Sequence, residues 1–258
     1  MFGDVVARAG RMAVLERIQD IREQYAIDFT VMNAENVAGG FSITPPLADQ
    51  LFAAGVDVMT SGNHIFDKKE VIPYIEKQPR LLRPANYAPG TPGRGMWKGA
   101  VNGTHVAVIS LLGRLFMQPA DDPFRVADAL LGELTPEFTV RLVDIHTEAT
   151  AEKAALAHYL DGRVSAVVGT HTHVQTADER VLPRGTGFIT DIGMTGSCAG
   201  VIGFEAADAV AKFTISQGLG RRSELSTGGV LICAVVIEVD ETTGKSRNIQ
   251  RLSLPHES

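Results

Sequence analysis

Short apolar stretches of strand length alternate along the chain with longer segments in which apolar residues recur every three or four positions. The short stretches are rich in Val and Ile, and several are apolar on both faces, as buried strands are. The pattern predicts strands at 29–34, 56–61, 106–112, 140–145, 165–170 and 187–192. It predicts helices at 11–25, 45–54, 68–77, 124–134, 149–160 and 204–216. This alternation is typical of an α/β fold with a mostly parallel core.

Three local signals add detail to this pattern of strands and helices. Asp67 followed by Glu70 predicts an N-cap with a reciprocal acid for the helix at 68–77. The dipeptide Asn102-Gly103 predicts a tight hairpin turn. The segment "GGVLICAVVIEVD" near the end predicts one long strand, in an antiparallel edge region or a second sheet.

Composition narrows the class of protein. The 258 residues show no compositional break, which predicts a single domain over 1–258, and the apolar fraction of 45% is ordinary for a soluble protein. A net charge of −6 argues against stable nucleic-acid or anionic-membrane binding. No apolar run approaches the ~20 residues of a membrane span, and the N-terminus lacks the layout of a signal peptide. Two cysteines fit a reducing compartment, so we expect a cytoplasmic protein.

Polar side chains capable of binding metals or carrying protons follow most of the predicted strands. Taken singly, each has an ordinary explanation as a turn residue, a loop residue or a buried histidine. Ligands of open α/β sheets collect beyond the carboxyl ends of strands, so their joint placement there indicates one site. The residues are Asp4, Glu35, Asn36, Asn63, His64, His146, His171 and His173.

The pair His171 and His173 in "VVGTHTHVQT" is the sharpest single signal among them. An extended backbone would direct both rings to the same side. The pair could be accidental, or it could be two ligands directed at one spot, with Thr172 pointing away and tolerating substitution.

The mixture of Asp, Glu, Asn and His suits Mn, Fe or Zn, and it offers more ligands than one tetrahedral zinc ion uses. A bridging carboxylate would let two ions sit roughly 3.5–4 Å apart, as two-metal phosphoryl-transfer sites require. A histidine beside the ions that does not coordinate them could protonate a leaving oxygen.

Longer motifs carry a resemblance to a known family. The successive segments "GD" (3–4), "NAEN" (33–36), "GNH" (62–64), His146 and "GTHTH" (169–173) resemble the calcineurin-like metallophosphoesterases. The segments "GNHIFDKKE", "RPANYAPGTPG", "DIHTEATAEK" and "TDIGMTG" are similar to the YmdB-like bacterial branch of that superfamily, and the resemblance runs over nearly the whole chain.

This resemblance implies a four-layer α/β/β/α sandwich of two mixed sheets and a metal-dependent phosphodiesterase acting on 2′,3′-cyclic nucleotides. A hydroxide that bridges two iron or manganese ions would attack the phosphorus. The first metal would be held by Asp4, Glu35, Asn36 and His173. Glu35 would bridge to the second metal, held also by Asn63, His146 and His171, and His64 would be the general acid. The partner would be a small-molecule phosphodiester, and family habit together with apolar edge strands suggests a homo-oligomer.

The chain departs from the family pattern in two respects. Ala7 and Ala34 stand where the family usually has Gly, which would be costly at a positive φ. Only Met1, Phe2 and Gly3 precede Asp4, so either the first strand is truncated or the true start lies upstream. A frayed strand would hold Asp4 less firmly and would weaken the first metal site.

Three other functions remain alternatives at this stage. The same site would suit a phosphomonoesterase or a broad phosphoesterase, because specificity depends on loops. A regulatory protein that senses nucleotides or metals with slow turnover would keep the same residues. An amidohydrolase barrel also uses an H-x-H pair, but there the pair normally follows the first strand, not one in the last third.

Overall fold

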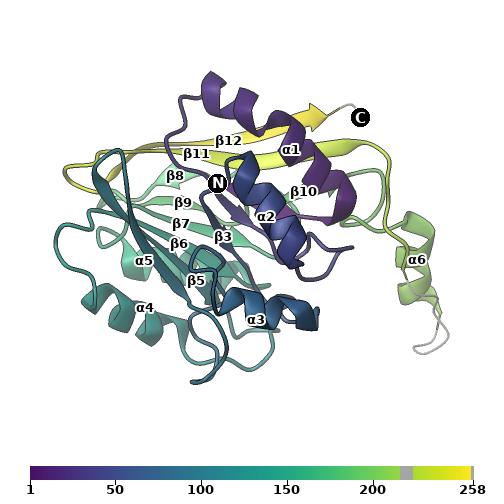
Figure 1. Cartoon of the computed structure of the whole chain (residues 1–258), viewed down its shortest axis with the longest axis horizontal. Coiled ribbons are helices and arrows are strands. Elements are labelled where there is room, and N and C mark those ends of the chain that lie inside the picture. Colours follow the sequence, from purple (N-terminus) through teal and green to yellow (C-terminus); the bar gives the residue numbers. More distant parts are fainter. Residues whose placement is uncertain (216–222, 257–258) are drawn as a thin grey trace.

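Two six-stranded mixed sheets lie face to face in the computed structural model (Figure 1), which describes residues 1–215 and 223–256. The first sheet has the order β12-β11-β10-β1-β2-β3 and consists of β1 (Phe2–Val5), β2 (Val31–Asn33), β3 (Val58–Thr60), β10 (Met194–Ser197), β11 (Val230–Val239) and β12 (Ser246–His256). The second has the order β4-β5-β6-β7-β9-β8 and consists of β4 (Met96–Val101), β5 (Thr104–Leu112), β6 (Val140–His146), β7 (Ala166–Thr170), β8 (Arg180–Val181) and β9 (Gly187–Ile189).

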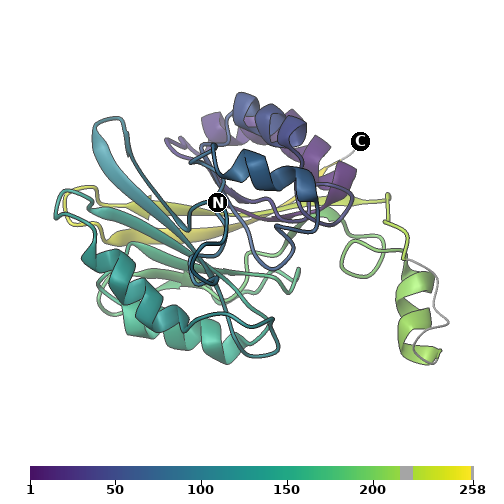
Figure 2. The same cartoon turned by 60° about the horizontal axis from the view of Figure 1, so that its bottom comes forward.

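Helices cover the outer face of each sheet (Figure 2). The first sheet carries α1 (Ala7–Gln24), α2 (Pro45–Ala54) and α3 (Ile72–Ile75), with a 3₁₀ turn at Lys69–Val71. The second carries α4 (Pro123–Gly132) and α5 (Thr150–Leu160), whereas α6 (Ala206–Thr214) stands apart from both sheets in the two views. The implied four-layer α/β/β/α sandwich is therefore confirmed. Within the described residues, no helix is both long and apolar enough to cross a membrane.

Each interface between layers has its own buried apolar cluster. Val14 and Leu51 pack from helices onto the first sheet, and Leu156 packs onto the second. Val31 and Val108 meet where the two sheets face each other. Strands that are buried on both faces must be apolar on both faces, which explains why the predicted strands lack simple alternation.

The pattern-based strands all occur, although β2, β3 and β9 are shorter than predicted and β5 and β6 extend beyond the predicted ranges. The Asn102-Gly103 hairpin is confirmed, because β4 and β5 pair antiparallel and both turn residues have positive φ. The long C-terminal strand is β11, which pairs antiparallel with β12 at the edge of the first sheet. Two open sheets exclude the amidohydrolase barrel.

Several helix predictions were wrong in detail. The first helix begins at Ala7, not residue 11, and the helix expected at 68–77 is a 3₁₀ turn followed by the single turn α3. Asp67 is not a cap: the N-terminal flanking residue is Lys68, without a side-chain capping bond. The last residue of the helix expected at 204–216, Ser216, lies outside the described residues.

The first strand is not frayed. The amino group of Met1 donates to the carbonyl of Val235 at 2.7 Å, and the Val235 amide donates to the carbonyl of Met1 at 2.8 Å. Strand β1 runs parallel to both β2 and β10, and the Asp4 amide donates to the Gly193 carbonyl. Hydrogen bonding from residue 1 onward therefore holds Asp4 firmly, against the sequence expectation.

The two alanines that replace the family's glycines differ in backbone conformation, which yields a stability prediction. Ala7 has a φ of 56°, whereas Ala34 is not among the residues at positive φ. An L residue in the left-handed region costs ~1–2 kcal/mol, so Ala7→Gly should stabilise the fold by about 1 kcal/mol after the entropy of Gly is subtracted. Denaturant unfolding of Ala7→Gly checks this, with Ala34→Gly as the matched control that should destabilise. Equal losses in both variants would contradict the prediction.

Candidate metal centre

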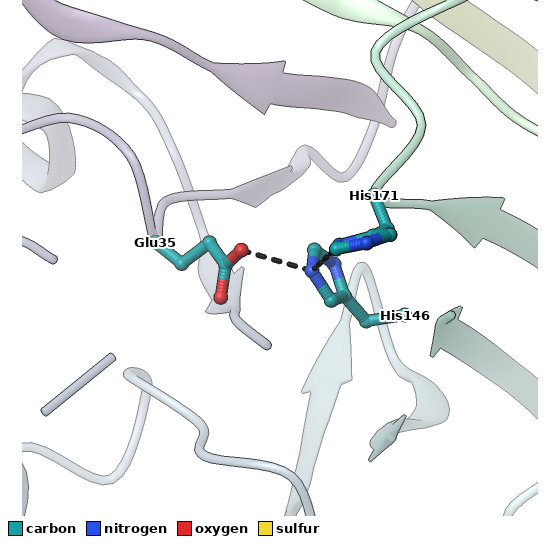
Figure 3. A group of neighbouring side chains, drawn as sticks. All are labelled: Glu35, His146 and His171. Carbon is teal, nitrogen blue, oxygen red and sulfur yellow. Dashed lines mark hydrogen bonds and ion pairs between the residues drawn. The ribbon is translucent and has the colours of Figure 1, made fainter. Parts of the chain in front are cut away.

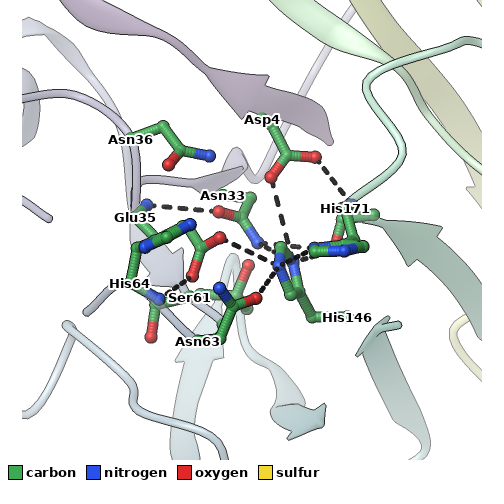
Figure 4. A network of polar contacts seen from close by, with 12 residues as sticks. Asp4, Asn33, Glu35, Asn36, Ser61, Asn63, His64, His146 and His171 are labelled. Atoms are coloured by element: carbon green, nitrogen blue, oxygen red, sulfur yellow. Dashed lines mark hydrogen bonds and ion pairs between the residues drawn. The ribbon is translucent and has the colours of Figure 1, made fainter. Parts of the chain in front are cut away.

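Four of the predicted ligands lie together at the carboxyl ends of the central strands, with the other three gathered around His146 (Figure 3, Figure 4). His146 Nε2 lies 2.9 Å from Glu35 Oε1, 3.2 Å from Asn63 Oδ1 and 3.0 Å from His171 Nδ1. Glu35 and Asn63 follow β2 and β3 of the first sheet, whereas His146 ends β6 and His171 follows β7 of the second. Both sheets therefore contribute to one cluster, and Glu35, His146 and His171 could together hold a metal ion.

The remaining predicted ligands form a second group beside the first. Asn36 Nδ2 lies 3.3 Å from His173 Nε2, and Asp4 Oδ1 lies 3.9 Å from the same nitrogen. Asp4 is fully buried, and its Oδ1 has no hydrogen-bond partner among residues 1–215 and 223–256. A buried carboxylate oxygen without a partner is costly, so it marks a position suited to a cation.

The histidines of both groups are oriented by an acceptor on the far side of each ring. His146 Nδ1 contacts Thr170 Oγ1 at 2.9 Å, and His171 Nε2 contacts Glu148 Oε2 at 3.3 Å. His173 Nδ1 lies 3.3 Å from the carbonyl of Ile202. A proton on each of these far nitrogens leaves a lone pair on the near nitrogen, which is how metal-binding histidines are held. The donor set therefore fits metal ions.

His64 lies at the edge of this cluster, and Glu35 separates it from His146 (Figure 4). Its backbone amide donates to Glu35 Oε2 at 2.8 Å, and its Nδ1 lies 2.7 Å from Asp67 Oδ2. The ring is a third exposed, and the geometry directs its Nε2 away from Asp67. Asp67, which sequence reasoning assigned to a helix cap, instead orients this histidine.

Burial and neighbouring charges together set the pKa values of the cluster. Burial alone would raise the pKa of Glu35, but the charge and hydrogen bond of His146 outweigh it and lower that pKa to about 2. Burial would lower the pKa of His146, but Glu35 raises it to about 9. Burial and the neighbouring His146 charge lower the pKa of His171 to about 3, so this ring is neutral and ready to bind a metal.

Asp144 was missed by the sequence analysis, although it supports the site from behind. It is buried in β6, and its Oδ1 accepts a hydrogen bond from Thr170 Oγ1 at 2.8 Å. Thr60 Oγ1 donates to its other oxygen. Burial raises the pKa of Asp144 to about 6. The chain from His146 through Thr170 to Asp144 fixes the ring nitrogen that His146 offers.

The H-x-H segment is a turn rather than an extended strand, which corrects the sequence expectation. Strand β7 ends at Thr170, and His171 and His173 have φ values of 103° and 64°. Positive φ at non-glycine residues is strained and persists only where surrounding contacts impose it.

Thr172 supplies contacts that hold this turn. Its amide and hydroxyl donate to Asp191 Oδ2 at 3.1 and 2.8 Å, and the same oxygen lies 2.7 Å from Lys153 Nζ. Lys153 and Asp191 are both fully buried. These contacts argue against the expected tolerance of Thr172 to substitution.

A cavity of about 520 Å³ lies at the opposite ends of the strands. Its lining includes Phe29, Val106, Val140 and Ile237, and none of the predicted site residues. The predicted site residues therefore gather at the carboxyl-end cluster, away from this cavity, whose lining mixes apolar residues with polar ones such as Asn102 and Glu241.

The raised pKa of His146 makes metal binding depend on pH. In the metal-free protein this ring is protonated below about pH 9, and a metal ion on its Nε2 must displace that proton. Apparent affinity should therefore rise ~10-fold per pH unit up to about pH 9 and then level off. Calorimetry at pH 7 in two buffers of different ionisation enthalpy should count at least one proton released. Binding without proton release would contradict the prediction.

Known proteins match this chain over nearly its whole length. A family model described as YmdB-like protein matches residues 1–252. A 2′,3′-cyclic-nucleotide 2′-phosphodiesterase of Bacillus subtilis (strain 168) is 44% identical over 250 residues, which are 97% of this chain and 94% of that protein. A crystal structure of a hypothetical protein from Thermus thermophilus has a TM-score of 0.92 and 41% identity, covering 99% of this chain and 98% of its own. A structure described as a novel phosphatase from Mycoplasma pneumoniae has a TM-score of 0.92 and 31% identity, and the match covers 98% of this chain and 92% of that one.

Proposed function

The chain belongs to the YmdB-like family, and on that premise we propose that it is a metal-dependent phosphodiesterase that hydrolyses 2′,3′-cyclic nucleotides. The observation that carries the proposal is the gathering of three donor atoms within 3.2 Å of His146 Nε2. Beside them lie Asp4 Oδ1, which has no hydrogen-bond partner in the part of the chain that the structure describes, and a partly exposed histidine. The relative of Bacillus subtilis, named for this activity, supports the choice of substrate.

The two groups of ligands would divide two ions between them. Asp4, Asn36 and His173 would bind one ion, and the other would be bound by the group around His146. Glu35 lies between His146 and the His64 backbone: its Oε1 contacts His146, while its Oε2 accepts the His64 amide. A carboxylate with a pKa of about 2 is anionic at any physiological pH, which suits a bridging role.

When bound, the two ions supply a nucleophile that is activated at neutral pH and positive charge against the phosphate. Iron or manganese suits this mixed donor set, and zinc is the alternative. The elemental identity of the ions is therefore part of the test below.

The protein's own part in the reaction is to bind the phosphate and deliver a proton. Asn63 holds its amide oxygen toward His146, so its amide nitrogen is free to turn toward a phosphate oxygen. His64 would give its Nε2 proton to the 2′ oxygen as the ester bond breaks, and Asp67 would keep the ring in that orientation. A nucleoside 3′-phosphate would leave.

Two other activities remain on the same geometry. A phosphomonoesterase or broad phosphoesterase needs the same cluster with different loops around it. A sensor of nucleotides or metals needs the cluster without turnover. A partly exposed His64 beside the cluster favours a hydrolase over a sensor, because a site that only binds has no use for a proton donor, and the choice of a diester rests on the relative's named activity.

Elemental analysis of metal-reconstituted protein, combined with rates on four substrates, tests the proposal. The substrates are 2′,3′-cyclic AMP, 3′,5′-cyclic AMP, a bis(nitrophenyl) phosphate and a nitrophenyl monophosphate. We expect two ions per chain and the highest kcat/KM on 2′,3′-cyclic AMP. Faster hydrolysis of the monoester would assign a phosphomonoesterase, and two bound ions with negligible turnover would assign a sensor.

The expected cytoplasmic location belongs to the same proposal. Cys198 and Cys233 are both free thiols, which supports a reducing compartment. Retention of both thiols in protein isolated from the native cell fraction would agree with this location.

A further inference from the structure

The buried metal cluster meets solvent beside His64, on a rim from which a substrate could reach it. Glu35 and His146 are 1% and 0% exposed, whereas the side chain of His64 is 33% exposed. Phe41 adjoins His64 on this rim: their ring centroids are 5.0 Å apart in an edge-to-face arrangement, and Phe41 is 36% exposed. Phe41 is a large apolar ring at the surface beside the proposed general acid His64, so a bound ligand would cover it.

The segment that presents Phe41 is built with unusual backbone geometry. Gly39, Gly40 and Ser42 all have positive φ, and a Cβ at Gly40 would lie 3.1 Å from Leu225. Ser42 is fully buried, and its hydroxyl donates to the carbonyl of Ile65, the residue after His64. Strain in a non-glycine residue persists where contacts impose it, so this hydrogen bond fixes Phe41 against the His64 segment.

An apolar surface continues from Phe41 toward the second metal-ligand group. Phe204 lies 6.2 Å from Phe41 between ring centroids. Ile202, which is 48% exposed, places its carbonyl beside His173. The open rim therefore has polar ligands at its base and an apolar wall formed by Phe41, Ile202 and Phe204.

Substrate chemistry determines what this wall would meet. His64 would protonate the 2′ oxygen, and the nucleobase is attached to C1′, the carbon adjacent to C2′. The base must therefore lie within a few ångströms of His64, on the solvent side of the buried ligands. Every nucleobase has a π face, and aromatic side chains bind such faces by stacking.

We propose that Phe41 is the nucleobase-binding residue of this site, stacking on the base and favouring cyclic nucleotides over phosphodiesters that lack one. This inference rests on the proposed function. It assigns Phe41 to substrate affinity, not to the proton transfer performed by His64. Purine substrates should therefore be preferred over pyrimidine substrates.

The test compares 2′,3′-cyclic AMP with methyl ribofuranoside 2,3-cyclic phosphate, which has no base. Phe41→Ala and Phe41→Leu should lower kcat/KM on the nucleotide ~5- to 100-fold through KM, and leave the base-free substrate within ~2-fold. Phe41→Trp should restore the preference. Phe213→Ala, which removes a 90% exposed ring on the separate helix α6, is the matched control and should change neither rate. Equal losses on both substrates would overturn the proposal, because Phe41 would then act on His64 alone.

Equilibrium binding separates this inference from the proposed function. Isothermal titration with adenosine 3′-monophosphate and with ribose 3-phosphate requires no turnover. Selective weakening of the adenosine ligand by Phe41→Leu supports the proposal even if the wild-type protein hydrolyses neither cyclic substrate. Equal binding of the adenosine ligand by Phe41→Leu and the wild-type protein overturns it, whatever the rates.

Discussion

Glu35→Gln is expected to lower the metal content from two ions per chain to at most one and to lower turnover on 2′,3′-cyclic AMP by ~10³-fold or more. The substitution keeps the shape of the side chain but replaces an anion whose pKa is about 2 with a neutral amide. A bridging ligand serves both ions, so its loss removes several kcal/mol of stabilisation from the transition state. Elemental analysis and steady-state rates on the same preparation measure both effects.

The controls must separate lost metal from lost folding, because Glu35 forms a buried pair with His146. Circular dichroism and thermal melting of the metal-free protein report whether Glu35→Gln folds. Glu35→Asp keeps the charge on a shorter side chain and should retain more metal than Gln. Glu137→Gln, on an exposed turn before β6, is the matched control. A folded Glu35→Gln protein with two ions and normal turnover would exclude the bridging role.

The convergence of the candidate site could be predicted because it depends on strand ends, which sequence patterns locate well. Asp4 lies within β1, and the other residues lie at or just after the ends of β2, β3, β6 and β7. Parallel strands bring their carboxyl ends to one edge, so residues distant in the sequence meet there without any knowledge of loop structure. The pairing of the two sheets was implied only by family resemblance, since no local signal specifies which strands share a sheet.

The supporting residues could not be predicted, because their roles depend on tertiary contacts. Asp144 lies between Val143 and Ile145 in a largely buried strand, where a lone acid looks like an exception. Lys153 has the appearance of a solvated helix residue, yet it is fully buried against Asp191. Positive φ at His171 is imposed by the contacts of the turn and contradicts the local preference of a non-glycine residue. Asp67 satisfied a capping pattern while its carboxylate turned toward His64.

His64→Ala is expected to lower kcat on 2′,3′-cyclic AMP by ~10²- to 10⁴-fold while both metal ions remain bound. The ring does not reach the cluster around His146 Nε2, and the contact from residue 64 to Glu35 comes from the backbone amide, which alanine retains. The loss should depend on the leaving group. A 2′ alkoxide needs a proton as it departs, whereas nitrophenolate is stable without one, so the loss on a bis(nitrophenyl) phosphate should be less than ~10-fold.

The dependence of the rate loss on the leaving group distinguishes a proton donor from a residue that only shapes the site. His158→Ala, on the exposed face of α5, should leave both rates unchanged. Asp67→Asn should show the same leaving-group pattern as His64→Ala with a smaller loss, because it disturbs the orientation of the ring without removing it. Equal losses on both substrates, or full turnover of 2′,3′-cyclic AMP by His64→Ala, would assign the proton to another group. Since Asn63 adjoins His64 and would bind metal, normal metal content in His64→Ala is what makes the comparison decisive.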